Sequence, residues 1–314
     1  MRLAAIDIGS NAVRLLIQDV VADEAGQVHK KKISFTRVPI RLGEDVFATG
    51  MISEAKTVAL TKAMKAFWYL MDLNGVEHFR ACATSAMREA KNGQEVADQI
   101  FHSANLRIDL ISGQTEADLI FGTLGTSDLL SGYLENDLLY IDVGGGSTEI
   151  TLIRGGERQR SSSFLLGTVR SMQRMTPDNE WSAVEAFLLS VRGEIAPSAD
   201  RPLLAVGTGG NINRYHRLSR TGRGEPVSLK QLKKLHADLA ALSYEERIEQ
   251  YGLKPDRADV ILPAGEIYLK VMALADCKGI IVPKVGLTDG IILGLFEETR
   301  GDQGDQGDQG DQGD

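Results

Sequence analysis

The feature that most limits how this chain can fold is an internal repeat. The segment Ile6–Asn11 (IDIGSN) reappears as Ile141–Gly146 (IDVGGG), with Asp142 standing 135 residues after Asp7. In both copies an apolar strand ends in an aspartate and leads into a turn of small residues, two further expected strands and a Leu-Gly step. Self-similarity on this scale indicates two duplicated domains that face each other across a cleft.

The alternation of apolar and polar residues predicts the elements of each copy. Strands are expected at 3–8, 12–21, 28–38, 79–84 and 107–111, and in the second copy at 149–153 and 158–165. Helices are expected at 95–104 and 116–129, and over 288–299, which we expect to pack back on the first domain. Ser53 is expected to cap a further helix that ends at Asn74 and Gly75. That helix should have one apolar face, made by Val58, Leu60, Met64, Phe67, Trp68 and Met71.

Length and charge set the outer limits. A chain of 314 residues is expected to form two domains. We expect an α/β protein with one domain at 1–125 and the other at 126–300. The GDQ repeat at 301–314 is low-complexity and is expected to be disordered. The formal net charge is −8, and the five aspartates of this tail leave −3 for the rest. This balance argues against a nucleic-acid binder, although a local basic cleft for a polyanion remains open.

Targeting and cysteine signals point to a reducing compartment. Cys82 and Cys277 are the only cysteines and show no metal-binding spacing, so both are expected to be buried free thiols. The N-terminus has no signal-peptide pattern, and no apolar run approaches the length of a membrane span. The five histidines show no ligand spacing either. We therefore expect a cytoplasmic protein.

The two repeated turns have the composition of phosphate sites. Small residues let backbone N–H groups converge on an anion, because no Cβ atom blocks its approach. The candidates are Gly9, Ser10, Asn11, Gly144, Gly145, Gly146 and Ser147. Acidic residues beside such turns would repel a phosphate unless a cation intervenes, so Asp142, Glu149 and Asp7 predict Mg²⁺ (or Mn²⁺), held partly through water. Alternatively, Asp7 and Asp142 only cap the turns.

A third glycine turn follows the apolar strand that ends at Val206. It contains Gly207, Gly209 and Gly210 and opens a helix near Ile212, whose N-terminus would attract another phosphate. The alternative is a tight strand-to-helix connection without a ligand.

With these segments in view, the chain resembles the exopolyphosphatase/guanosine pentaphosphate phosphatase family. The resemblance rests on seven motifs in the family's order, from Ile6 to about Gly290: DIGSNxxR, RLGE, ATSxxR, ISGxxEA, DxGGGSTE, GTGG and RADVI. It implies the duplicated ribonuclease-H-like (actin-like ATPase) fold, dependence on Mg²⁺, a homodimer, and hydrolysis of a terminal phosphoanhydride.

The resemblance also implies roles for single residues. Glu116 occupies the catalytic glutamate position, where a carboxylate can accept a proton from the attacking water; alone, a glutamate in the first turn of a helix would instead suggest dipole stabilisation. Arg88 matches the phosphate-binding arginine, and Arg14 a position that contacts the polyanion. Glu149 is a second catalytic candidate. Arg257 heads RADVI and would bind a distal phosphate or nucleotide, unless it is an ordinary surface residue.

Some positions depart from the family pattern. Thr115 stands where many relatives carry an acidic residue, and the segment after Asp289-Gly290 lacks the usual Arg and Glu. The C-terminal extension of longer relatives is also absent, so we expect a short form of the family. A basic stretch is either a solvated face or a track for polyphosphate; it comprises Arg214, Arg217, Arg220, Arg223, Lys230, Lys233 and Lys234.

Three function classes stay open. The first is a phosphohydrolase acting on inorganic polyphosphate or, as a close variant, converting the guanosine polyphosphate pppGpp to ppGpp. The second is an ATP-using kinase or chaperone-like ATPase of the same fold, and the third is a catalytically weak protein that binds polyphosphate or ppGpp. The motif around Glu116 favours the first class.

Overall fold

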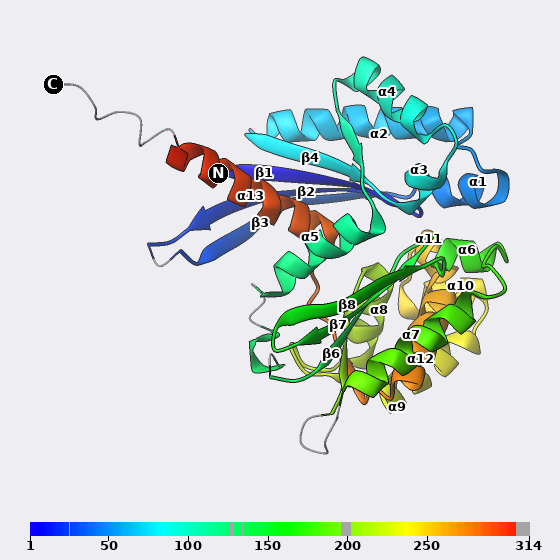
Figure 1. Cartoon of the computed structure of the whole chain (residues 1–314). Coiled ribbons are helices and arrows are strands. Elements are labelled where there is room, and N and C mark those ends of the chain that lie inside the picture. The colour runs from blue at the N-terminus through cyan, green and yellow to red at the C-terminus, as the bar shows by residue number, and fades with distance from the viewer. Residues whose placement is uncertain (25, 126–128, 134, 196–201, 306–314) are drawn as a thin grey trace.

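The protein consists of two α/β halves that repeat one arrangement (Figure 1). The computed structural model describes residues 1–24, 26–125, 129–133, 135–195 and 202–305. Within these residues one sheet has five strands in the order β3-β2-β1-β4-β5, and the other has six in the order β10-β11-β9-β6-β7-β8.

In the first half, β1 pairs antiparallel with β2 and parallel with β4, so the carboxyl end of β1 at Asp7 reaches the same edge as that of β4. The strands are β1 (Arg2–Ile8), β2 (Val13–Ala22), β3 (Val28–Val38), β4 (His78–Ala83) and β5 (Ile108–Leu110). The helices are α1 (Leu42–Thr49), α2 (Glu54–Leu73), α3 (Ser85–Glu89) and α4 (Gly93–Ala104).

The second half repeats this pattern, because β6 pairs antiparallel with β7 and parallel with β9. The expected duplicated α/β fold is therefore confirmed. The strands are β6 (Leu138–Val143), β7 (Thr148–Arg154), β8 (Glu157–Phe164), β9 (Leu204–Thr208), β10 (Val227–Ser228) and β11 (Gly279–Ile281). The helices are α6 (Thr168–Met172), α7 (Glu180–Glu194), α8 (Gly210–Ser219), α9 (Leu229–Ala240), α10 (Tyr244–Tyr251), α11 (Pro255–Ala258) and α12 (Ile261–Ala275).

Two helices connect the halves. α5 (Gly113–Gly125) leads toward the short 3-10 helix Ser131–Tyr133, and α13 (Leu287–Asp305) packs against α5 and β1, as expected (Figure 1). Because α13 lies on the first sheet, we propose that it belongs to the first domain rather than to the domain expected at 126–300. α13 also includes 301–305, whereas 306–314 of the expected disordered tail lie outside the described residues.

The cores follow the sequence pattern with one exception. In α2 the residues Leu60, Met64, Phe67 and Met71 are buried, but Val58 and Trp68 are 44% and 38% exposed. At about 100° per residue, Val58 lies on the helix face opposite the apolar stripe, and Trp68 stands at the edge of the stripe. Both cysteines are free and buried, as expected. Over the described part of the chain, no helix combines the length and the apolar character needed to span a membrane.

Candidate active site

The two repeated turns touch each other at the centre of the molecule. A Cβ atom on Gly145 would lie 2.7 Å from Cβ of Ser10, and one on Gly146 would lie 2.6 Å from Oγ of Ser85 and 2.5 Å from the ring of Phe47. Contacts this short exclude any side chain larger than hydrogen. The turns therefore face each other, as the repeat predicts, and their closeness explains the glycines of the second turn.

The Leu-Gly step of each half holds its turn from behind. In the first half the amides of Arg41 and Gly43 donate to the carbonyls of Asn11 (3.0 Å) and Ser10 (2.8 Å). In the second half the amides of Thr168 and Val169 donate to the carbonyls of Gly144 (3.0 Å) and Gly145 (2.9 Å). These bonds draw the acceptors of both turns away from the space between them, which makes that space suitable for an anion.

A narrow pocket of about 100 Å³ lies between the turns. Most of the predicted site residues line it: Asp7, Gly9, Ser10, Asn11, Arg14, Glu116, Asp142, Gly144, Gly145, Ser147, Gly209, Gly210 and Arg257. The prediction missed five polar residues that also line it: Arg37, Thr84, Ser85, Thr168 and Asn211. Three of these carry a sequence signal, because Thr84 and Ser85 lie in the ATS motif and Thr168 follows the second Leu-Gly step.

Four predicted site residues lie behind this lining. Glu149 is buried, and its Oε1 accepts hydrogen bonds from the hydroxyls of Ser147 (2.8 Å) and Ser163 (2.9 Å). The guanidinium of Arg88 donates to the carbonyl of Ile111 (2.8 Å), just before α5. Gly146 is wedged between Phe47 and Ser85, as described above. The fourth, Gly207, lies in β9, where the side chains of Ile280 on β11 and Ile212 on α8 pack against it.

The carboxylates of the site repel one another. Asp142 and Glu149 stand opposite each other on β6 and β7. Burial and the charge of Asp142 raise the pKa of Glu149 to about 7, and burial raises the pKa of Asp142. Burial together with Glu149, Asp142 and Asp7 raises the pKa of Glu116 well above its ordinary value, whereas the charge of Arg88 lowers it. A cation or a proton would relieve this repulsion.

The donor set fits Mg²⁺ only if water and phosphate complete its coordination. Among the described residues, no three His, Cys, Asp or Glu side chains converge closely enough to hold a metal. Asp7 lines the pocket but is paired with Arg14, and Glu149 accepts two hydroxyls, so Asp142 and Glu116 are the lining carboxylates left to face a cation. Carboxylate oxygens suit Mg²⁺, which keeps several waters when one or two carboxylates and substrate phosphates bind it.

Arginines converge on the other wall of the pocket. Arg257 donates to Oδ1 of Asn211 (2.9 Å), and its guanidinium would lie 2.4 Å from a Cβ atom on Gly210. Burial and the charges of Arg37 and Arg14 lower the pKa of Arg257 to about 10. An anion bound here would offset this mutual repulsion.

A wider pocket of about 760 Å³ adjoins the narrow one, and the two share Arg14, Arg37 and Arg257 in their linings. Its described lining includes two aspartates, Asp7 and Asp289, but nine cations: Arg14, Lys32, Arg37, Arg214, Arg217, Arg220, Lys254, Arg257 and Lys284. Three residues of the basic stretch thus face the wide pocket, while Arg223, Lys230, Lys233 and Lys234 are not part of its lining.

Comparisons with known proteins agree with this geometry. Residues 20–299 match the Ppx/GppA phosphatase family. Exopolyphosphatase 1 of Mycobacterium tuberculosis is 26% identical over 308 residues, covering 93% of this chain and 88% of that protein. The guanosine-5'-triphosphate,3'-diphosphate pyrophosphatase of Aeromonas salmonicida is 26% identical over 302 residues, covering 93% of this chain and 59% of that protein. The crystal structure of the Aquifex aeolicus member of the Ppx/GppA family superposes with a TM-score of 0.73 at 26% identity, covering 95% of this chain and 98% of that one.

Proposed function

The chain belongs to the Ppx/GppA phosphatase family, and from that premise we propose that it is an exopolyphosphatase, which hydrolyses the terminal phosphoanhydride of inorganic polyphosphate. The observation that carries this proposal is the joining of the two pockets. A narrow space between two glycine turns suits one terminal phosphoryl group, and the nine cations of the wide pocket suit the charged chain behind it. ATP, with three phosphates, would leave most of these cations unused.

The reaction would proceed by attack of water on the terminal phosphorus. The turn amides hold the phosphoryl oxygens, and the bond from phosphorus to the bridging oxygen breaks as the new bond to water forms. Glu116 accepts the proton of the water, and Arg14 and Arg257 stabilise the negative charge on the departing chain. The products are orthophosphate and a chain shorter by one phosphate.

The other predicted residues take supporting roles in this proposal. Glu149, whose pKa is about 7, raises the pKa of Glu116 through its charge and orients Ser147 by accepting a hydrogen bond from its hydroxyl. Asp142 would hold Mg²⁺, which would supply charge neutralisation between the carboxylates and the phosphate. We also propose that the chain forms the homodimer that the family resemblance implies. Sedimentation analysis of its oligomeric state tests this.

A second candidate substrate is guanosine 5'-triphosphate 3'-diphosphate. The wide pocket contains groups that an inorganic chain would not use, namely the half-exposed ring of Phe35 and the buried Oδ1 of Asn213. Within the described residues this oxygen has no hydrogen-bond partner. A nucleobase could stack on the ring and donate to the amide oxygen.

The deciding experiment compares orthophosphate release from long-chain polyphosphate, tripolyphosphate, guanosine 5'-triphosphate 3'-diphosphate and ATP. We expect the highest kcat/KM on long-chain polyphosphate. Arg217→Ala should raise KM for long chains and leave tripolyphosphate unaffected, whereas Arg223→Ala, outside the pocket lining, should change neither. A preference for the guanosine nucleotide would select the second candidate, and release from ATP alone, or from no substrate, would refute the proposal.

A further inference from the structure

A buried arginine joins the two halves directly beneath the glycine turns. Arg170 in α6 is only 7% exposed. Its Nε donates to the carbonyl of Gly146 (2.8 Å), a terminal nitrogen donates to Oε2 of Glu89 (2.6 Å), and its guanidinium carbon lies 4.2 Å from the centre of the Phe47 ring. The first contact is to the second turn, and the other two are to α3 and α1 of the first half.

Each of these partners supports a part of the site. The Gly146 carbonyl belongs to the same peptide as the amide of Ser147, whose hydroxyl donates to Glu149. In a trans peptide the C=O and N–H groups point in opposite directions. Holding the Gly146 carbonyl against Arg170 therefore aims the Ser147 amide toward the pocket that Ser147 lines.

The contact to Glu89 concerns the other wall. Glu89 ends α3 directly after Arg88, and Arg88 in turn holds the carbonyl of Ile111 before the helix that carries Glu116. One guanidinium thus connects the second turn to α3, whose Arg88 holds the start of the helix that carries Glu116, the proposed base.

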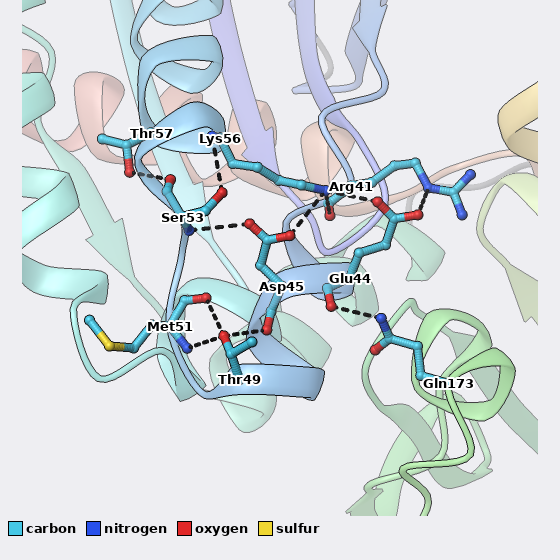
Figure 2. A network of polar contacts seen from close by, with 9 residues as sticks. All are labelled: Arg41, Glu44, Asp45, Thr49, Met51, Ser53, Lys56, Thr57 and Gln173. Atoms are coloured by element: carbon cyan, nitrogen blue, oxygen red, sulfur yellow. Dashed lines mark hydrogen bonds and ion pairs between the residues drawn. The ribbon is translucent and has the colours of Figure 1, made fainter.

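Other contacts already hold α6 in place, so Arg170 is not needed merely to attach it. The side chain of Val169 is part of the first half's core, and the side-chain amide of Gln173 donates to the carbonyl of Glu44 (2.7 Å), as Figure 2 shows. Figure 2 also shows the Glu44 carboxylate ion-paired with Lys56 and Arg41, so further polar contacts hold the α1 end of this contact. A buried charge is costly unless fully paired, and an apolar side chain could fill the same space. The arginine at this site therefore indicates that its hydrogen bonds are needed to hold their partners in place.

We propose that Arg170 is a positioning residue. It keeps the Gly146–Ser147 peptide aligned with α1 and α3, so that groups from both halves can bind the same terminal phosphate. This inference rests on the proposed function for its kinetic consequence, but its geometric content does not. Since the wide pocket supplies most of the charge that binds a polyanion, loss of Arg170 should leave KM nearly unchanged. Misalignment of the terminal phosphate should lower kcat about 10–100-fold.

The test uses Arg170→Met, which keeps the length of the side chain and its contact with Phe47 but removes both hydrogen bonds. The matched control is Arg154→Met, because Arg154 also donates to one carboxylate, Asp137, and one backbone carbonyl, that of Glu194, at an exposed site. Kinetics on long-chain polyphosphate should show the fall in kcat for Arg170→Met with KM nearly unchanged. Arg154→Met should match the parent. If Arg170→Met does not fold by circular dichroism, Arg170→Lys is measured by the same criteria.

A second readout is independent of turnover. Spectra of protein labelled with ¹⁵N-glycine are recorded with and without inorganic tripolyphosphate. We expect the glycine amide shifts that tripolyphosphate causes in the parent and in Arg154→Met to be lost or altered in the Arg170 variant. A parent that releases no phosphate would refute the proposed function, while these spectra would still decide the role of Arg170. A folded Arg170 variant with parental spectra, or with kcat within about twofold of the parent and far short of the misalignment range, would overturn the inference.

Discussion

Replacing Glu116 by glutamine tests the proposed chemistry most directly. Glutamine keeps the shape and the hydrogen-bonding reach of Glu116 but cannot accept the proton of the attacking water. General-base assistance contributes about 10²–10⁴-fold to a rate, and we expect kcat of Glu116→Gln to fall within that range. KM should stay the same or decrease, because the substitution removes one negative charge that faces a polyanion.

The carboxylate cluster adds a second signature. Glu116 must be ionised to act as a base, and its pKa is raised by burial and by Glu149, Asp142 and Asp7. Parental activity should therefore fall as the pH drops through this raised pKa. In Glu116→Gln this titrating group is absent, so the acidic limb that it causes should be missing from the residual activity.

The assay is orthophosphate release from polyphosphate between pH 5 and 9. The control is Asp118→Asn, which alters an exposed carboxylate on the same helix, paired with Arg158, and should leave kcat unchanged because surface ion pairs contribute little. The reasoning is refuted if Glu116→Gln turns over within about threefold of the parent, well short of the general-base range. Glu149 would then be the better candidate for the base.

Three further outcomes are expected. Activity should vanish in excess EDTA and return with Mg²⁺ or Mn²⁺, since carboxylates and phosphate share one pocket; full turnover in the chelator would contradict this. The pKa of Glu149 is raised in the folded protein, so protonation of Glu149 stabilises the fold as the pH falls through about 7. Tm of Glu149→Gln should therefore depend less on pH between 8 and 6 than Tm of the parent. Gly145→Ala places a Cβ atom 2.7 Å from Ser10 and should reduce kcat about 100-fold by displacing the turn; Gly193→Ala, with no atom within 4 Å, should retain full activity, and equal effects would argue against the close contact of the turns.

Much of the fold could be predicted because its signals are local. Strands β1 and β6 are apolar runs whose penultimate residues are Asp7 and Asp142, and the expected strand at 28–38 coincides with β3. Ser53 caps α2 through its hydroxyl, as expected. The internal repeat then predicted that the two copies are equivalent domains, and this prediction needed no contact between them.

The site was predicted less completely, because its residues come from segments distant in the sequence. Arg37 lies on β3 and pairs with Asp256 of α11, and no local pattern distinguishes Arg37 from the other cations of that strand. Nor does a motif show that Glu149 and Arg88 lie behind the lining of the narrow pocket rather than in it. Such placement depends on how far each half turns toward the other.

The sequence by itself determined the duplication, the strand–turn–strand units and the type of residue at each turn. These follow from side-chain periodicity and from the conformational freedom of glycine, which act over a few residues. Only the tertiary structure decided that the turns touch, that nine cations line one wide pocket, and that Arg170 links Gly146 to Glu89. It also decided the raised pKa values of Glu116 and Glu149, because burial and the charge of neighbouring carboxylates depend on distances in space, which sequence separation does not encode.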